Sequence, residues 1–169
     1  FAVLPEGIQN DSYTAQIKET LKARRGNLEK IAREYYKHLA EFDMFIGTED
    51  DDHFLITRKP NGITTIEVKD EDGEVIAEKT YDSKDTRMVW VYGLDGDDEF
   101  QITGEGSSLL PLKIIGGEEN DVYDFQNKKK AKLYDYKSKD NTIKTPGARK
   151  MLVDSYDINN YDPKKKRIR

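Results

Sequence analysis

Three segments of the sequence place a glycine five residues before an aspartate, and these residue types in this pattern could bind a cation. The pairs are Gly47 and Asp52, Gly93 and Asp98, and Gly116 and Asp121. Glycine permits positive φ, so a turn can direct backbone carbonyls inward, and aspartate supplies the hard oxygen that Ca²⁺ prefers. The same residues also form tight, solvated corners between strands, so the pattern alone leaves both interpretations open.

An apolar residue precedes each glycine, and an aromatic residue follows each aspartate by two positions: Phe54, Phe100 and Tyr123. We therefore expect strand, acidic turn and strand in each copy, with the three aromatic side chains on one interior face. The interval between the second and third copies is half the interval between the first and second. This spacing has two interpretations. Either the structural repeat has the length of the shorter interval, and Asp70–Gly73 is a degenerate copy of the turn, or an antiparallel hairpin is inserted around Lys59–Gly62 between the first two copies.

These turns resemble the glycine- and aspartate-rich nonapeptide of hemolysin-type (RTX) calcium-binding β-rolls. Gly93–Gln101 departs from that motif only at Leu94, and Gly116–Asp124 has Glu119 at the third glycine position. The resemblance implies a Ca²⁺ ion held between two stacked turns. The candidate ligands are the side chains of Asp95, Asp98 and Asp121 and the backbone carbonyls of Gly93 and Gly116. Mg²⁺ is expected to bind poorly, because it requires a small and regular octahedron.

Other chemistry has little support in the sequence. The absence of cysteine excludes disulfides, thiolate metal sites and a cysteine nucleophile. The two histidines, His38 and His53, cannot build a histidine-rich metal centre, and we expect His53 to point away from the core. Gly104–Ser108 lacks the Gly-x-Ser-x-Gly pattern, and 33 acidic residues make any one carboxylate pair uninformative as a glycosidase dyad. We therefore expect a protein without catalytic activity.

The periodicity predicts the elements that would position the turns. Cap candidates and apolar residues at helical spacing predict two helices over residues 12–25 and 28–42, separated at Gly26-Asn27, with the apolar stripe of the second docked on a sheet. Short strands with period-two patterning follow. We expect a helical segment over 1–44, a β domain over 45–140 and an irregular segment with a basic tail over 141–169. The predicted fold is mostly β, with stacked short strands and Gly/Asp turns, β-roll or solenoid-like in part.

The charge distribution narrows the partners. The chain of 169 residues carries 28 basic and 33 acidic side chains, and five of the basic ones lie in its last six positions. Without them, 23 basic residues face 33 acidic ones, a net charge of −10 that would repel phosphate backbones, so we do not expect nucleic-acid binding. No window approaches the ~18 consecutive apolar residues of a membrane span, so direct membrane insertion is not expected. The start, Phe-Ala-Val-Leu-Pro, suggests a piece of a longer protein.

The order of features resembles a linking segment of large Gram-negative cell-envelope proteins. In those, a calcineurin-like metallophosphoesterase precedes the segment and a surface-antigen-type outer-membrane β-barrel follows it. The likeness lies in Leu21–Arg25, Tyr35-Tyr36, Val91–Asp98, Ile114–Gly117 and Tyr156–Asp162. The phosphoesterase activity is not implied, because the histidine-bearing elements that bind its two metals are missing here.

The resemblance implies a cell-envelope location, periplasmic or associated with the outer membrane, and the rest of the same polypeptide as partner. The sequence thus predicts a non-catalytic spacer or docking module, stabilised by Ca²⁺ if the acidic turns bind it. The alternative is an accessory or substrate-binding domain that serves an attached phosphoesterase.

Overall fold

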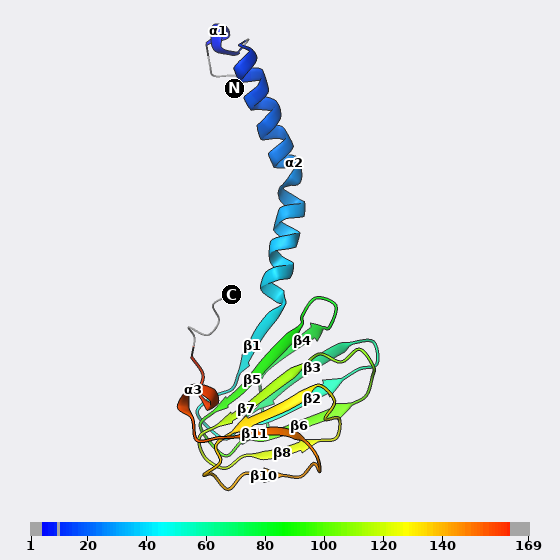
Figure 1. Cartoon of the computed structure of the whole chain (residues 1–169), viewed down its shortest axis with the longest axis vertical. Coiled ribbons are helices and arrows are strands. Elements are labelled where there is room, and N and C mark those ends of the chain that lie inside the picture. Colours follow the sequence, from blue (N-terminus) through cyan, green and yellow to red (C-terminus); the bar gives the residue numbers. More distant parts are fainter. Residues whose placement is uncertain (1–4, 10, 163–169) are drawn as a thin grey trace. The chain divides into compact units, whose positions relative to one another are not determined.

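The computed structural model describes residues 5–9 and 11–162, and the predicted basic tail lies outside them. Within this part the chain has three helices and eleven strands, which form two sheets (Figure 1). The chain divides into two compact units, with the division between Leu39 and Ala40. The helices are α1 (Glu6–Gln9), α2 (Ser12–Ala40) and α3 (Tyr156–Asn159).

Helix α2 is a single helix of 29 residues, so the predicted break at Gly26-Asn27 is wrong. One glycine inside a helix costs about 1 kcal/mol, and the Ala, Leu, Lys, Arg and Glu residues on both sides favour the helix enough to carry it through. Ion pairs on its surface add support, such as Arg33 with Glu29 at 2.7 Å. The apolar side chains of the predicted stripe are exposed, Leu28 at 59% and Ile31 at 56%.

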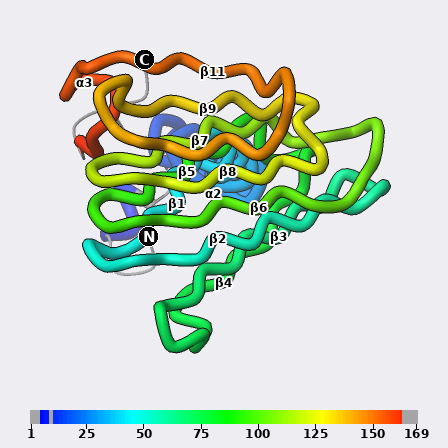
Figure 2. Tube along the Cα trace, turned by 90° about the horizontal axis from the view of Figure 1, so that it is seen from below, coloured from blue at the N-terminus to red at the C-terminus, as the bar shows by residue number. Residues whose placement is uncertain are grey.

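Sheet A is parallel throughout. Its strands, in spatial order, are β1 (Phe42–Ile46), β5 (Met88–Leu94), β7 (Leu112–Gly117), β9 (Ala131–Asp135) and β11 (Arg149–Leu152). Sheet B is mixed, in the order β10 (Thr142–Ile143), β8 (Val122–Phe125), β6 (Glu99–Gly104), β2 (His53–Arg58), β3 (Ile63–Lys69) and β4 (Val75–Asp82). From β5 onward the chain alternates between the sheets, as Figure 2 follows it.

The many short strands were predicted correctly, but the arrangement is a mixed α/β fold with two sheets. No solenoid is shown, and the strands are not stacked as in a β-roll. One reason is that β2 and β3 pair antiparallel around Lys59–Gly62, which is the hairpin that the second alternative predicted. A further hairpin, β3–β4, turns at Asp70–Gly73, where the first alternative placed a degenerate rung. Another reason is that the sequence offset between paired strands of sheet B changes from β2–β6 to β6–β8 and again to β8–β10, so no short repeat is kept. The segment predicted to be irregular contains β10, β11 and α3.

The main core lies between the sheets, and its centre is the predicted aromatic row. Phe54 pairs with Phe100 and Phe100 with Tyr123 in the strand register, and all three are fully buried. Their rings stack nearly parallel, with centroids 4.5 Å apart for the first pair and 5.2 Å for the second. The expectation of one shared interior face is therefore confirmed. Side chains of β2, β6 and β8 thus pack in layers, and the turns that precede these strands are aligned by the same register.

Truncation of the middle ring should be costly. We expect Phe100→Ala to lower the free energy of unfolding by about 3–5 kcal/mol, because it removes a buried ring with a stacked neighbour on each side. Urea unfolding followed by circular dichroism measures this loss. The control is Tyr36→Ala on α2, where the ring is 69% exposed and the change should stay within about 0.5 kcal/mol. A loss below about 1 kcal/mol for Phe100→Ala would contradict the packing described here.

Candidate functional site

Four turns lie side by side where strands of sheet A connect to strands of sheet B. Turn 1 is residues 47–52, turn 2 is 93–98, turn 3 is 116–121 and turn 4 is 135–141, where each turn is counted from the position that the register of sheet A aligns with Gly116. Each ends in two consecutive Asp or Asn residues directly before a strand of sheet B. The strand register aligns these four pairs, which are Asp51-Asp52, Asp97-Asp98, Asn120-Asp121 and Asp140-Asn141. We call the first members the outer row and the second members the inner row.

The inner row connects each turn to the next through side chains. The backbone N–H of Asp52 donates to Oδ1 of Asp98 at 2.9 Å, and the N–H of Asp98 donates to Oδ1 of Asp121 at 3.0 Å. The N–H of Asp121 then donates to Oδ1 of Asn141 at 2.7 Å. The three aspartates are buried, with at most 3% of each exposed. The side chains of Asp98, Asp121 and Asn141 therefore each satisfy a backbone donor of the preceding turn.

The outer row makes the same kind of bond in the opposite direction. The N–H of Asp97 donates to Oδ1 of Asp51 at 2.8 Å, and the N–H of Asn120 donates to Oδ1 of Asp97 at 2.9 Å. The N–H of Asp140 donates to Oδ1 of Asn120 at 3.0 Å. Successive turns are thus joined by two side-chain bonds of opposite polarity. The sequence pattern identified the inner aspartates. It missed the outer row, because all four of its residues lie one position before the inner row and so outside the five-residue spacing from glycine to aspartate.

The glycines are needed for space rather than for positive φ. A Cβ on Gly93 would overlap Oδ2 of Asp98, and a Cβ on Gly116 would overlap Oδ2 of Asp121. Neither glycine has φ in the left-handed region; Gly96 and Gly117 have it instead. The aspartate side chain folds back over the glycine that begins its turn, so the glycine and the aspartate of each copy form one packing unit. The predicted reason for these glycines was therefore wrong.

Turn 4 has Asp135 where turn 3 has Gly116, since β7 and β9 pair Ile115 with Tyr134. Asp135 is fully buried, and its Oδ2 lies 2.7 Å from the hydroxyl oxygen of Tyr123. The same hydroxyl lies 3.1 Å from Oδ2 of Asp121. A phenol has one proton, so it can donate to only one of these carboxyl groups at a time. The sequence pattern missed Asp135 because the fourth turn is longer and lacks the glycine.

Burial dominates the electrostatics of the inner row. Desolvation raises the pKa of Asp98 to about 9, and the nearby charges of Asp121 and Asp52 act in the same direction. Desolvation also raises the pKa of Asp121 to about 8, with the charge of Asp135 as the next cause. The pKa values of Asp52 and Asp135 are raised as well, again mainly by burial. The ionised form of these carboxyl groups is therefore unfavourable in the metal-free protein, and a bound proton or cation would offset the desolvation of their charge.

The structure brings together most, but not all, of the predicted calcium ligands. Asp98 and Asp121 are neighbours in the inner row, and the carbonyl of Gly116 lies beside Gly93, the glycine that Asp98 covers. Oδ2 of Asp98 is buried and has no hydrogen-bond partner. Asp95 does not join them: it is exposed, and its Oδ1 accepts the N–H of Gly96 at 3.1 Å. Across the described ranges, no group of three or more His, Asp or Glu side chains is gathered as a metal site.

Neither histidine is a member of the inner row. His38 lies on α2, and His53 begins β2 next to the buried Phe54, so its ring points to the other face as expected. The His53 side chain is 39% exposed, and its Nε2 lies 3.9 Å from Oε2 of Glu99.

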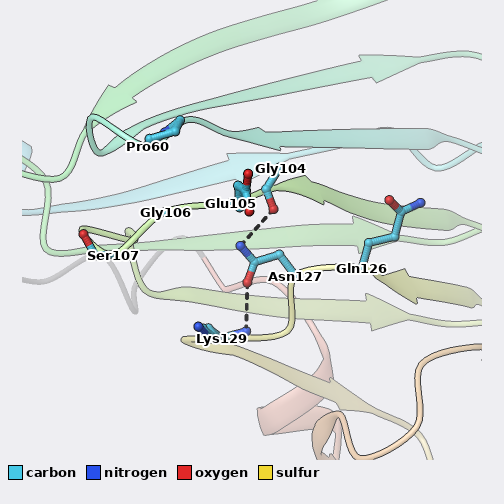
Figure 3. Close-up of a pocket in the computed structure, with 8 residues that line it drawn as sticks. All are labelled: Pro60, Gly104, Glu105, Gly106, Ser107, Gln126, Asn127 and Lys129. Carbon is cyan, nitrogen blue, oxygen red and sulfur yellow. Dashed lines mark hydrogen bonds between the residues drawn. The ribbon is translucent and has the colours of Figure 1, made fainter.

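A second concave region lies at the other ends of β2, β6 and β8 (Figure 3). Its volume is about 890 Å³, and its walls are Pro60, the loop 104–107 and residues Gln126, Asn127 and Lys129. Asn127 holds the loop by donating to the carbonyl of Gly104 at 3.0 Å. Its walls contain one carboxylate, Glu105, one lysine, Lys129, and no histidine. Gly104 and Gly106 in this loop have positive φ.

Comparison of the chain with protein-family models, with curated proteins and with solved structures finds no match. The resemblances to RTX repeats and to the envelope linker therefore stay predictions. No helix in the described part of the chain is both long and apolar enough to cross a membrane.

The raised carboxyl pKa values predict how stability depends on pH. In the unfolded chain aspartate titrates near pH 4, whereas Asp98 and Asp121 keep their protons to about pH 9 and 8 when folded. Between these limits the native state binds more protons than the unfolded state, so the free energy of unfolding should fall as pH rises from 5 to 9. Urea unfolding of metal-free protein at pH 5, 7 and 9 measures the slope. The double variant Asp98→Asn/Asp121→Asn should have a flatter profile, and a parent protein that gains stability over this range would contradict the assignment.

Proposed function

We propose that this chain is a non-catalytic module of a larger cell-envelope protein, where it acts as a spacer or docking domain. The proposal is based on the hydrogen bonds that the acidic residues of the turns make to the backbone. In the inner and outer rows, Asp and Asn side chains accept backbone N–H groups of neighbouring turns. Such side chains hold a scaffold together and are not oriented towards a substrate. The cell-envelope location rests on the resemblance to the linker between a phosphoesterase and an outer-membrane barrel.

We include in this proposal a solenoid-like character for the part from β5 to β10. It is supported by parallel pairing in both sheets, with β5 beside β7 and β6 beside β8 at one common sequence offset. A unit in which each turn contacts mainly its neighbours transmits little strain along its length and suits a spacer.

We further propose that Ca²⁺ binds between turns 2 and 3, with Asp98, Asp121 and the carbonyl of Gly116 as ligands; the carbonyl of Gly93, predicted as a further ligand, lies beside Gly47 instead. The support is Oδ2 of Asp98, a buried carboxylate oxygen without a hydrogen-bond partner beside the Gly116 carbonyl. A cation there would offset the desolvation of two neighbouring carboxylates. Ca²⁺ suits such a site because it accepts carbonyl and carboxylate oxygen in irregular geometry. Asp95, predicted as a third ligand, is left out because it lies outside the row.

Calcium should then raise the melting temperature. Binding to the folded state alone stabilises it by RT ln(1 + [Ca²⁺]/Kd), about 2.7 kcal/mol at a hundred times Kd. We expect a clear upward shift in millimolar Ca²⁺ relative to chelator, a small one in Mg²⁺, and a markedly smaller Ca²⁺ shift in Asp98→Asn or Asp121→Asn than in the parent. Asp95→Asn is the matched control and should behave like the parent. If the parent does not shift, the acidic turns are hydrogen-bonded corners only.

An accessory role in substrate binding is favoured by one observation, an aromatic and basic row on the outer face of sheet A. Nζ of Lys113 lies 3.9 Å from the ring centroid of Trp90 and 4.2 Å from that of Tyr134. Phe42 packs edge-on against Trp90, with 5.0 Å between the ring centroids. A row of this kind offers ring faces and a positive charge to a phosphorylated substrate.

Because the chain has one tryptophan, fluorescence tests this alternative directly. Titration with a phosphodiester that does not absorb where tryptophan is excited, such as glycerophosphocholine, should change Trp90 emission to saturation if this face binds substrate. Lys113→Ala should weaken the response at least tenfold, whereas Lys84→Ala, an exposed lysine at the end of β4, should leave it unchanged. A response that does not saturate in the parent would reject substrate binding here and favour the spacer role.

A further inference from the structure

The inner row has an open end at turn 1. Asp98 and Asp121 each accept, at Oδ1, the backbone N–H of the aspartate one turn earlier. Asp52 belongs to the first of these turns, and its Oδ1 is buried without a hydrogen-bond partner. Its other oxygen, Oδ2, already accepts the backbone N–H and the hydroxyl of Thr48, at 2.6 and 3.1 Å. Asp52 is only 3% exposed, so Oδ1 is a desolvated acceptor whose donor is missing.

A small acidic pocket adjoins this open end. Its volume is about 260 Å³, and it is formed between turns 1 and 2 and the turn of the β3–β4 hairpin. Six carboxylates line it, against Lys69 and His53 as the basic side chains: Asp51, Asp52, Asp70, Glu71, Asp97 and Glu99. Lys69 lies 3.4 Å from Glu67, and His53 lies near Glu99, so both positive groups have acidic neighbours. We call this region the Asp52 pocket.

We propose that the Asp52 pocket binds a divalent cation of the Ca²⁺ type, with Oδ1 of Asp52 as its buried ligand. The side chains of Asp70, Glu71 and Glu99 line the same pocket but are not gathered as a metal site in the metal-free chain, so they would move towards the cation to complete the oxygen set. The cation takes at turn 1 the place that a backbone N–H takes at turns 2 and 3. Charge excludes an anion here, and the hard oxygen donors favour Ca²⁺ over softer metals. This site does not depend on the proposed Ca²⁺ site between turns 2 and 3, with which it shares no ligand.

The hairpin gives this site a mechanical consequence. The turn at Asp70–Gly73 is held by its own bonds, in which Gly73 donates to the carbonyl of Asp70 and Glu74 donates to Oδ1 of Asp70. Asp70 and Glu71 therefore come from a preformed turn of β3–β4, while Asp52 and Glu99 come from turn 1 and from the start of β6. A cation bound by all of them would tie the hairpin to the parallel part of sheet B.

The test is isothermal titration of metal-free full chain with CaCl₂ at pH 7, combined with amide hydrogen exchange. The double variant Asp70→Asn/Glu71→Gln changes only the surface turn and should keep the fold. We expect it to weaken Ca²⁺ binding at this site at least tenfold, and Asp52→Asn to do the same. Glu78→Gln is the control, since it removes an exposed carboxylate of β4 that does not line the pocket. In the parent, Ca²⁺ should slow exchange of the amides of residues 70–74, and this should persist in Asp98→Asn.

Two results would overturn the proposal. One is a parent protein that takes up no Ca²⁺ at millimolar concentration, or whose uptake is the same in Asp70→Asn/Glu71→Gln. The other is Ca²⁺ binding that Asp98→Asn abolishes completely, which would place all of it between turns 2 and 3. A third result would support this site and reject the one between turns 2 and 3. In it, Asp98→Asn and Asp121→Asn have the same Ca²⁺-induced melting shift as the parent, and Ca²⁺ still slows amide exchange of residues 70–74.

Discussion

The β unit depends on one interaction, a buried aspartate that accepts the backbone N–H of the adjacent turn. Where a strand of sheet A connects to a strand of sheet B, the backbone leaves one ladder before it enters the other, and its N–H groups need partners. Asp98 and Asp121 supply them from the next turn along the row. Because these bonds join equivalent positions, they set the same register that the strands of sheet B continue.

Several other features follow from that carboxylate. It folds back over the first residue of its turn, so Gly93 and Gly116 cannot carry a Cβ. It also precedes by two positions the residue that faces the core, so alignment of the aspartates aligns Phe54, Phe100 and Tyr123 in a stack. The cost is the burial of several carboxyl groups at one edge, which raises their pKa values. At that edge, stability is therefore coupled to whatever proton or cation accompanies these groups.

The sequence predicted the structure correctly where a residue type has the same physical role in every copy of the Gly/Asp pattern. The sequence offsets between the Gly/Asp copies equal the offsets of strand pairing in sheet B, so the aromatic stack could be predicted. Asp135 could not, because a carboxylate replaces the glycine and the turn is longer. The choice between a degenerate rung at Asp70–Gly73 and a hairpin around Lys59–Gly62 depends on the antiparallel pairing of β3 with β2, which local turn residues do not specify. Gly26 resembled a helix end only because local preference was considered without its strongly helical neighbours.

At the opposite ends of the same strands, a cationic side chain donates hydrogen bonds to backbone carbonyls. Arg58, at the end of β2, is 2% exposed and donates to the backbone carbonyls of Asn127 and Leu110, at 3.1 and 3.3 Å. Burial lowers its pKa to about 10, so the guanidinium remains charged at neutral pH. Carboxylates thus hold backbone donors at one edge, and a guanidinium holds backbone acceptors at the other. Side-chain-to-backbone bonds therefore fix the strand register at both ends of β2, β6 and β8, and a unit fixed in this way can keep its register independently of flanking chain, which the proposed spacer role would require.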